Sequence, residues 1–229
     1  MSHRWTAPLL PLLLCAVAAM GTAAAVTGVG VGFGIGDPIP PHPRLIATPE
    51  KVARLQDVIK LDPEAAYHVG ELAAQGTAML SEPPVVQPPP GPSGILTTVR
   101  AVVGRVMTLG LLHMLRWNDS NDDNTTHTED SNNANATAWS TRAILELHAF
   151  ANFTTWNPPH FLDTAEGTFA MAVGLDWLDD ALSDVDRAYF QDTLVRLGLN
   201  EGAKAFNNTG VCHWWTTSPS NWNQVQLAS

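Results

Sequence analysis

The sequence predicts an all-α fold, in the form of an incomplete (α/α) toroid of antiparallel helical hairpins. Apolar residues recur at helical spacing in several segments, helix-start signals precede most of them, and no convincing strand pattern appears. Very apolar helices alternate with amphipathic ones, as expected when an inner ring is buried and an outer ring is half exposed. A plain helical bundle fits the same pattern.

Each predicted helix has a recognisable start or an apolar face. Thr48 and Pro49 provide an N-cap and a first-turn proline for a helix over 49–60. Asp62, before Pro63, begins a second helix that reaches about residue 79. The segment 95–117 is apolar nearly all round, which predicts a buried helix. Further helices are predicted over residues 134–150, 161–182 and, with Ser183 as N-cap, 183–206.

The first 25 residues have the order of a secretory signal peptide. A short start containing Arg4 precedes an apolar run, and small residues at 23–25 form a cleavage site. An uncleaved membrane anchor is the alternative, because no charged residue lies between Arg4 and Asp37. Residues 26–43 are rich in glycine and proline and predict a linker, and residues 44–229 predict the helical domain.

Two segments within that domain are predicted to be irregular. The proline-rich segment 83–92 reads as an extended connection, and the polar segment 118–133 reads as a mobile surface insertion. Secretion agrees with five N-x-S/T sequons, which predict N-glycosylation. Their asparagines are Asn118, Asn124, Asn135, Asn152 and Asn207.

Charge and cysteine content exclude several classes of function. The formal net charge of −10 argues against a nucleic-acid partner. Once a signal peptide is removed, Cys212 is the only cysteine, so neither an internal disulfide nor a thiolate metal cluster can form. No metal or other cofactor is expected.

Chemistry-bearing residues gather in the segment 210–229. Flat aromatic faces there can stack on sugar rings, while neutral amides can bind hydroxyls and carboxylates without adding charge. A tryptophan-rich packing corner is the alternative, but buried amides would then need several partners each. The cluster consists of Trp214, Trp215, Asn221, Trp222, Asn223 and Gln224.

A second polar group stands at the start of the predicted fifth helix. His160, Asp163 and Glu166 follow at i, i+3 and i+6, so they lie along one side of it. Asp163 can orient the His160 ring and fix its tautomer. Helix capping is the alternative, since acids are favoured in a first turn in any case.

These residue types suit an acidic sugar better than a neutral one. No pair of opposed carboxylates accompanies the tryptophans, as a glycosidase would require. Amide or imidazole donors on a uronate carboxylate would instead spread the charge that develops when the C5 proton is removed. That chemistry is β-elimination, which breaks a uronic-acid polymer.

Several longer motifs resemble the helical domain of the heparinase II/III-like polysaccharide lyases. The resemblance implies an incomplete toroid followed by β-sheet domains, in a family that includes alginate and heparan lyases and is related to uronyl epimerases. It implies carboxylate neutralisation by Asn221, with Asn223 as contender, and a cleft lined by His160, Trp156 and Trp215. The motifs are His42–Leu45, Glu146–Phe153, Trp156–Glu166, Gly174–Leu178 and Asn221–Val225.

The chain departs from the family pattern in two ways. It ends four residues after the last motif, and the family's catalytic tyrosine and β-sheet domains have no counterpart. The expectation is therefore a secreted, truncated lyase-like chain, weakly active or inactive alone, whose partner is a uronate-containing polysaccharide or oligosaccharide. The alternatives are a uronyl C5-epimerase and a non-catalytic glycan-binding or scaffold fragment.

Overall fold

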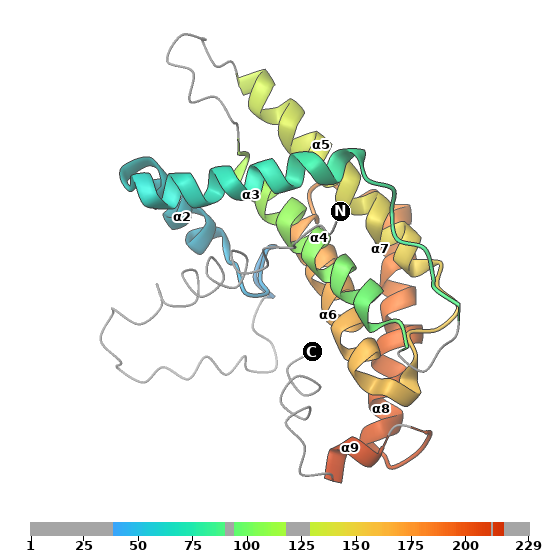
Figure 1. The fold of residues 1–229 in the computed structure, drawn as a ribbon. Coiled ribbons are helices and arrows are strands. Elements are labelled where there is room, and N and C mark those ends of the chain that lie inside the picture. Colours follow the sequence, from blue (N-terminus) through green and yellow to red (C-terminus); the bar gives the residue numbers. More distant parts are fainter. Residues whose placement is uncertain (1–38, 90–93, 118–128, 212, 218–229) are drawn as a thin grey trace, which may run out of the picture.

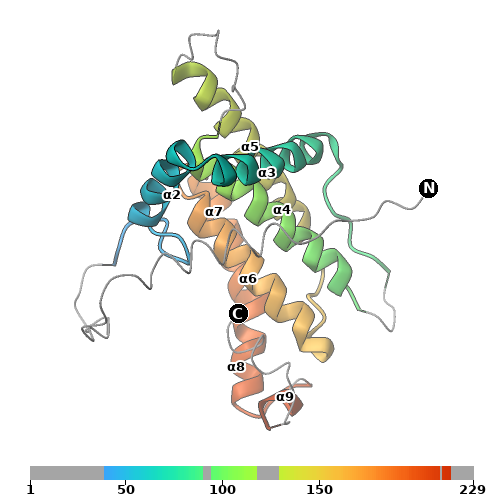
Figure 2. The same cartoon turned by 60° about the vertical axis from the view of Figure 1, so that its left-hand side comes forward.

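The computed structural model describes residues 39–89, 94–117, 129–211 and 213–217. Within these ranges every regular element is helical, which confirms the all-α class. Helix α3 crosses α4 and α5, while α8 and α9 lie at the opposite end of the molecule (Figures 1 and 2). The α-helices are α2 (Pro49–Leu61), α3 (Pro63–Ser81), α4 (Leu96–Leu115), α5 (Glu129–Ala151), α6 (Phe161–Trp177), α7 (Asp184–Thr193), α8 (Asn200–Phe206) and α9 (Trp214–Thr217).

Three predicted N-caps are present. The Thr48 hydroxyl accepts a hydrogen bond from the Lys51 amide at 3.4 Å, and the Asp62 carboxylate accepts one from the Glu64 amide at 2.9 Å. Ser183 caps α7 by accepting from the Asp186 amide at 3.1 Å. Each cap satisfies a backbone donor that the first helical turn leaves without a partner.

Helix α4 is the centre of the core, as its apolar sequence predicts. Val99, Val102, Val106, Leu109 and Leu112 are fully buried, and α5 and α6 pack along the helix. Among the described residues α4 alone is long and apolar enough to cross a membrane by length and composition. In the structure 61% of that stretch is buried inside the protein, as in the core helix of a folded domain.

Helix boundaries differ from the prediction at two places. Helix α5 begins at Glu129, inside the stretch predicted as an irregular insertion, and acids in a first turn favour a helix there. The predicted fifth helix ends at Trp177, and a turn over 178–181 replaces its last residues.

The predicted helix over 183–206 contains a change of pitch. A π-helical segment, Leu194–Leu199, separates α7 from α8. At Gly198 in this segment, an added Cβ would lie 2.4 Å from the Thr168 hydroxyl of α6. The backbone of the π segment therefore approaches α6 more closely than any larger residue would allow.

A buried ionic cluster joins α3, α4 and α5. Glu146 is fully buried, and its carboxylate accepts hydrogen bonds from Arg105 at 3.0 Å and from Arg142 at 2.7 Å. Arg105 also donates to Glu82 at 2.7 Å, and Arg142 donates to the Met79 carbonyl at 2.9 Å. Two arginines thus converge on one buried carboxylate, which fixes how these three helices meet.

Candidate functional site

Part of the predicted site lies outside the described residues. This holds for Asn221, Trp222, Asn223 and Gln224, and likewise for the predicted signal peptide and for the sequons at Asn118 and Asn124. The roles assigned to them from the sequence stay predictions. Of the terminal cluster, the described residues include Trp214 and Trp215, which form the first turn of α9.

Two tryptophans that were expected to contact sugar are core residues. Trp156 is fully buried and stacks on Phe150, with ring centroids 4.6 Å apart and planes 7° apart. Trp215 is 1% exposed and stacks on Phe161 at 4.9 Å. The expected cleft-lining roles of both residues are therefore wrong, because a ring without accessible faces cannot stack on a ligand. Trp214, in contrast, is 40% exposed.

His160 and Asp163 form a hydrogen-bonded couple at the start of α6. The distance between His160 Nδ1 and Asp163 Oδ1 is 2.5 Å, the contact that their spacing predicts. Asp163 is fully buried, whereas the His160 side chain is 34% exposed. A buried carboxylate thus orients a histidine that reaches the surface.

The other donors to Asp163 come from two loops. The Ile95 amide and the Asn157 side-chain amide each donate to Asp163 Oδ2 at 2.8 Å. Gly94 has a φ of 60°, and an added Cβ there would lie 2.4 Å from both Asn157 Nδ2 and Asp163 Oδ2. Gly94 therefore allows the turn before α4 to close over this carboxylate.

Glu166 is one turn further along α6 and is held by Arg100 of α4. The guanidinium donates from Nε to Oε2 at 3.0 Å and from Nη2 to Oε1 at 2.9 Å. This hydrogen bonding raises the pKa of Arg100 above its ordinary value. Arg100 is 58% exposed and Glu166 is 16% exposed, so the pair borders the surface.

The packing of Trp215 brings α9 to the start of α6. Its ring stacks on Phe161, the residue after His160, and meets Phe206 of α8 edge-on with centroids 5.5 Å apart. Residues 213–217 therefore lie beside the His160–Asp163 couple, although more than fifty residues separate the two segments. The candidate site is this end of the molecule, with His160, Asp163, Glu166 and Arg100 as its polar side chains.

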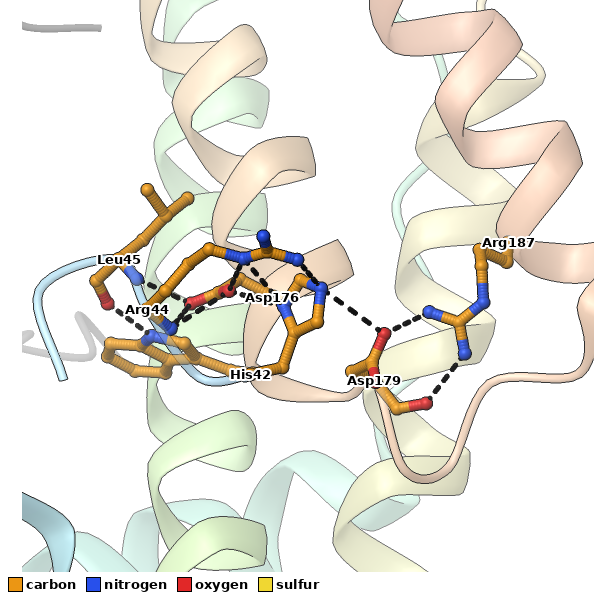
Figure 3. Close-up of polar contacts among 7 residues, drawn as sticks. His42, Arg44, Leu45, Asp176, Asp179 and Arg187 are labelled. Carbon is orange, nitrogen blue, oxygen red and sulfur yellow. Dashed lines mark hydrogen bonds and ion pairs between the residues drawn. The ribbon is translucent and has the colours of Figure 1, made fainter. Parts of the chain in front are cut away.

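A second polar centre joins the N-terminal segment to the end of α6 (Figure 3). Asp176 is 3% exposed and accepts hydrogen bonds from His42 Nδ1 at 2.6 Å, from the Arg44 amide at 2.8 Å and from the Leu45 amide at 2.7 Å. The Trp177 indole donates to the Leu45 carbonyl at 2.9 Å. His42, which the sequence assigns to the linker, thus contacts the helical domain.

The turn after α6 extends this centre. Arg187 contacts the Asp179 carboxylate and donates to the Asp179 carbonyl at 2.9 Å (Figure 3). His42 Nε2 lies 3.6 Å from Asp179 Oδ1. The turn over 178–181 is therefore tied both to α7 and to the N-terminal segment.

A pocket of about 290 Å³ opens beside these contacts. Val52 and Met114 line it together with His42, Asp179 and Asp180. Buried His113 contacts Asp180 Oδ1 at 2.8 Å through Nε2 and the Ala136 carbonyl at 3.0 Å through Nδ1. Its hydrogen bond holds the pKa of the Asp180 carboxyl below its ordinary value. The polar groups of this pocket serve mainly to bind one another.

Sequence reasoning missed Arg100 and the His42–Asp176 contact. The partners in that contact are 134 residues apart, a separation that no local periodicity reports. Arg100 is one of two arginines on a largely apolar helix, and the sequence does not show which carboxylate each of them binds. Within the described residues, no group of three or more His, Cys, Asp or Glu side chains is placed to hold a metal ion.

Comparisons with known proteins do not assign the chain to a family. The sequence matches no protein-family model, and no curated protein matches it significantly. The resemblance to heparinase II/III-like lyases therefore rests on the motifs themselves.

Proposed function

We propose that the chain is the helical portion of a polysaccharide lyase-like protein that breaks a uronic-acid-containing polysaccharide by β-elimination, on the incomplete toroid that the sequence predicts. The observation that carries the proposal is the His160–Asp163 couple at the start of α6, where α9 brings Trp214 to the same end of the molecule. A surface histidine with a buried carboxylate behind it is suited to proton transfer.

His160 is the group that takes the C5 proton. The hydrogen bond to Asp163 keeps a proton on Nδ1, so the lone pair of the neutral ring lies on Nε2. When Nε2 accepts the C5 proton, the imidazolium is stabilised by the adjacent carboxylate. The C5–H electron pair forms the C4–C5 double bond, the bond from C4 to the glycosidic oxygen breaks, and that oxygen takes the proton from the imidazolium.

The substrate carboxylate needs a donor, because proton removal at C5 places further negative charge on it. The resemblance to the lyases implies that Asn221 takes this role, with Asn223 as contender. By analogy with oxyanion-hole donors, losing such a group costs about 2.7–4 kcal/mol in barrier height. Arg100 lies at the same end of the molecule, where Glu166 offsets its charge, so the uncharged amide of Asn221 is the donor that the proposal needs.

The test is an absorbance assay for the unsaturated uronate product with alginate and heparan fragments as substrates. We expect His160→Ala to abolish product formation. His148→Ala is the matched control, because His148 is also a partly exposed histidine paired with an aspartate, at 2.8 Å from Asp186. Equal loss in both variants would contradict a specific role for His160.

Two other outcomes identify the alternative functions. Deuterium uptake at C5 without a double bond would assign the site to an epimerase. Binding of uronate oligosaccharides with neither product would assign it to a non-catalytic glycan-binding protein. Either result would contradict the proposal that the protein catalyses β-elimination.

A further inference from the structure

The sequon at Asn152 lies between residues that are held in place by packing and hydrogen bonds. Asn152 follows the last residue of α5 and is exposed. The next residue, Phe153, is 3% exposed and packs edge-on against Phe150. Thr154 is fixed on the other side, because its amide donates to Gln87 Oε1 at 2.8 Å. The asparagine is thus held at the surface between two anchored neighbours.

The side chain of Asn152 is itself oriented. The Tyr189 hydroxyl of α7 donates to Asn152 Oδ1 at 2.9 Å. None of the described residues hydrogen-bonds Asn152 Nδ2, the atom to which an N-linked sugar is attached. Because attachment leaves Oδ1 as an acceptor, the Tyr189 hydrogen bond is compatible with a glycan.

The Tyr189 ring that reaches Asn152 belongs to an aromatic pair. His148 stacks on Tyr189, with centroids 5.7 Å and planes 19° apart, and His148 Nε2 contacts Asp186 at 2.8 Å. Tyr189 therefore cannot rotate without losing contacts to both Asn152 and His148. Because the stacked rings cover one face of each other and both residues are half-buried, the outer side of the pair is the surface on which the apolar side of a sugar can pack.

The other two described sequons lie in different local surroundings. Asn135 lies within α5 and is half-buried, and Asn207 is exposed at the end of α8.

We propose that Asn152 carries an N-linked glycan whose first N-acetylglucosamine packs on Tyr189 and His148. Attached there, the sugar covers the joint between the end of α5 and α7 and stabilises it. The proposal does not rest on the lyase function, because neither glycan attachment nor its packing on Tyr189 requires His160 or Asp163.

The experiment is secretion of the 229-residue chain from a eukaryotic host, followed by enzymatic release of glycans in ¹⁸O water. We expect ¹⁸O-labelled aspartate at position 152. We also expect the protein trimmed to a single N-acetylglucosamine to keep its melting temperature, and complete removal to lower it by about 2–4 °C. Thr154→Ala, which removes this glycan together with the contact between the Thr154 hydroxyl and Gln87, should lower the melting temperature at least as far, and Thr154→Ser, which keeps the sequon and the hydroxyl, should not.

Variants of Tyr189 distinguish packing of the sugar on this ring from mere attachment of a glycan to Asn152. In Tyr189→Ala the difference between trimmed and fully deglycosylated protein should disappear, whereas Tyr189→Phe should keep most of it. Asn207→Gln is the control and should leave that difference unchanged. An unoccupied Asn152, or equal melting temperatures for trimmed and fully deglycosylated wild type, would overturn the proposal.

Discussion

His42 Nδ1 lies 2.6 Å from Asp176 Oδ1, so residues 134 positions apart close the N-terminal segment onto α6. The carboxylate also accepts hydrogen bonds from two consecutive backbone amides, those of Arg44 and Leu45. A carboxylate that satisfies three donors while almost fully buried is a strong local constraint. The segment before α2 is therefore part of the folded domain rather than an appendage to it.

Replacing that carboxylate should destabilise the whole domain. Asp176→Asn turns one acceptor oxygen into a donor that faces other donors, and we expect a loss of about 2–4 kcal/mol in the free energy of unfolding. Urea denaturation followed by circular dichroism measures it. Asp179→Asn, at a carboxylate 31% exposed, should cost about 1 kcal/mol or less. A small effect at Asp176 would mean that the N-terminal segment is not held through it.

Two glycine-to-alanine changes should have opposite signs. Gly94→Ala places a Cβ 2.4 Å from Asn157 Nδ2 and Asp163 Oδ2 at a φ of 60°, so we expect a loss of roughly 3 kcal/mol. Gly104→Ala, within α4 and with no atom within 4 Å of the added Cβ, should stabilise by up to about 1 kcal/mol. Thermal unfolding of both variants is the measurement. Stabilisation by Gly94→Ala would show that the turn does not close over Asp163.

The buried ionic cluster gives a third prediction. Glu146→Gln leaves the Arg105 and Arg142 guanidinium groups without their shared carboxylate, which should cost about 3–5 kcal/mol. Glu166→Gln is the matched change, since Glu166 also binds an arginine but that arginine is 58% exposed. It should cost about 1 kcal/mol or less. Similar losses of unfolding free energy for the two variants in urea denaturation would contradict the prediction that the buried pair contributes more than the exposed one.

Acid should weaken the domain partly through Asp180. Its pKa is lowered, chiefly by the hydrogen bond from His113, so the unfolded chain binds this proton more readily than the folded one. The stabilisation is complete above the unfolded-state pKa of about 4 and is lost as pH falls through the lower folded-state pKa. Asp180→Asn should therefore lose less stability than wild type over that range. Asp57→Asn, at a carboxylate 73% exposed, should follow the wild-type curve.

The sequence predicted the helices more fully than the site. Thr48, Asp62 and Ser183 cap helices where expected, because capping depends on residues two or three positions apart. The contact of His160 with Asp163 was predictable for the same reason. The burial of Trp156 and Trp215 was not, because Phe150 and Phe161 reach them only once α5, α6 and α9 are packed. Residue type alone does not distinguish a core tryptophan from one that binds sugar.

The most direct test of the proposed function is the binding of a uronate oligosaccharide, measured by calorimetric titration beside the same oligosaccharide with its carboxyl groups reduced. We expect saturable binding of the acidic form alone, weakened at least tenfold, or about 1.4 kcal/mol, by His160→Ala and unchanged by His148→Ala. Binding that is equal for the reduced oligosaccharide, or that His160→Ala leaves intact, would contradict a uronate site at the start of α6.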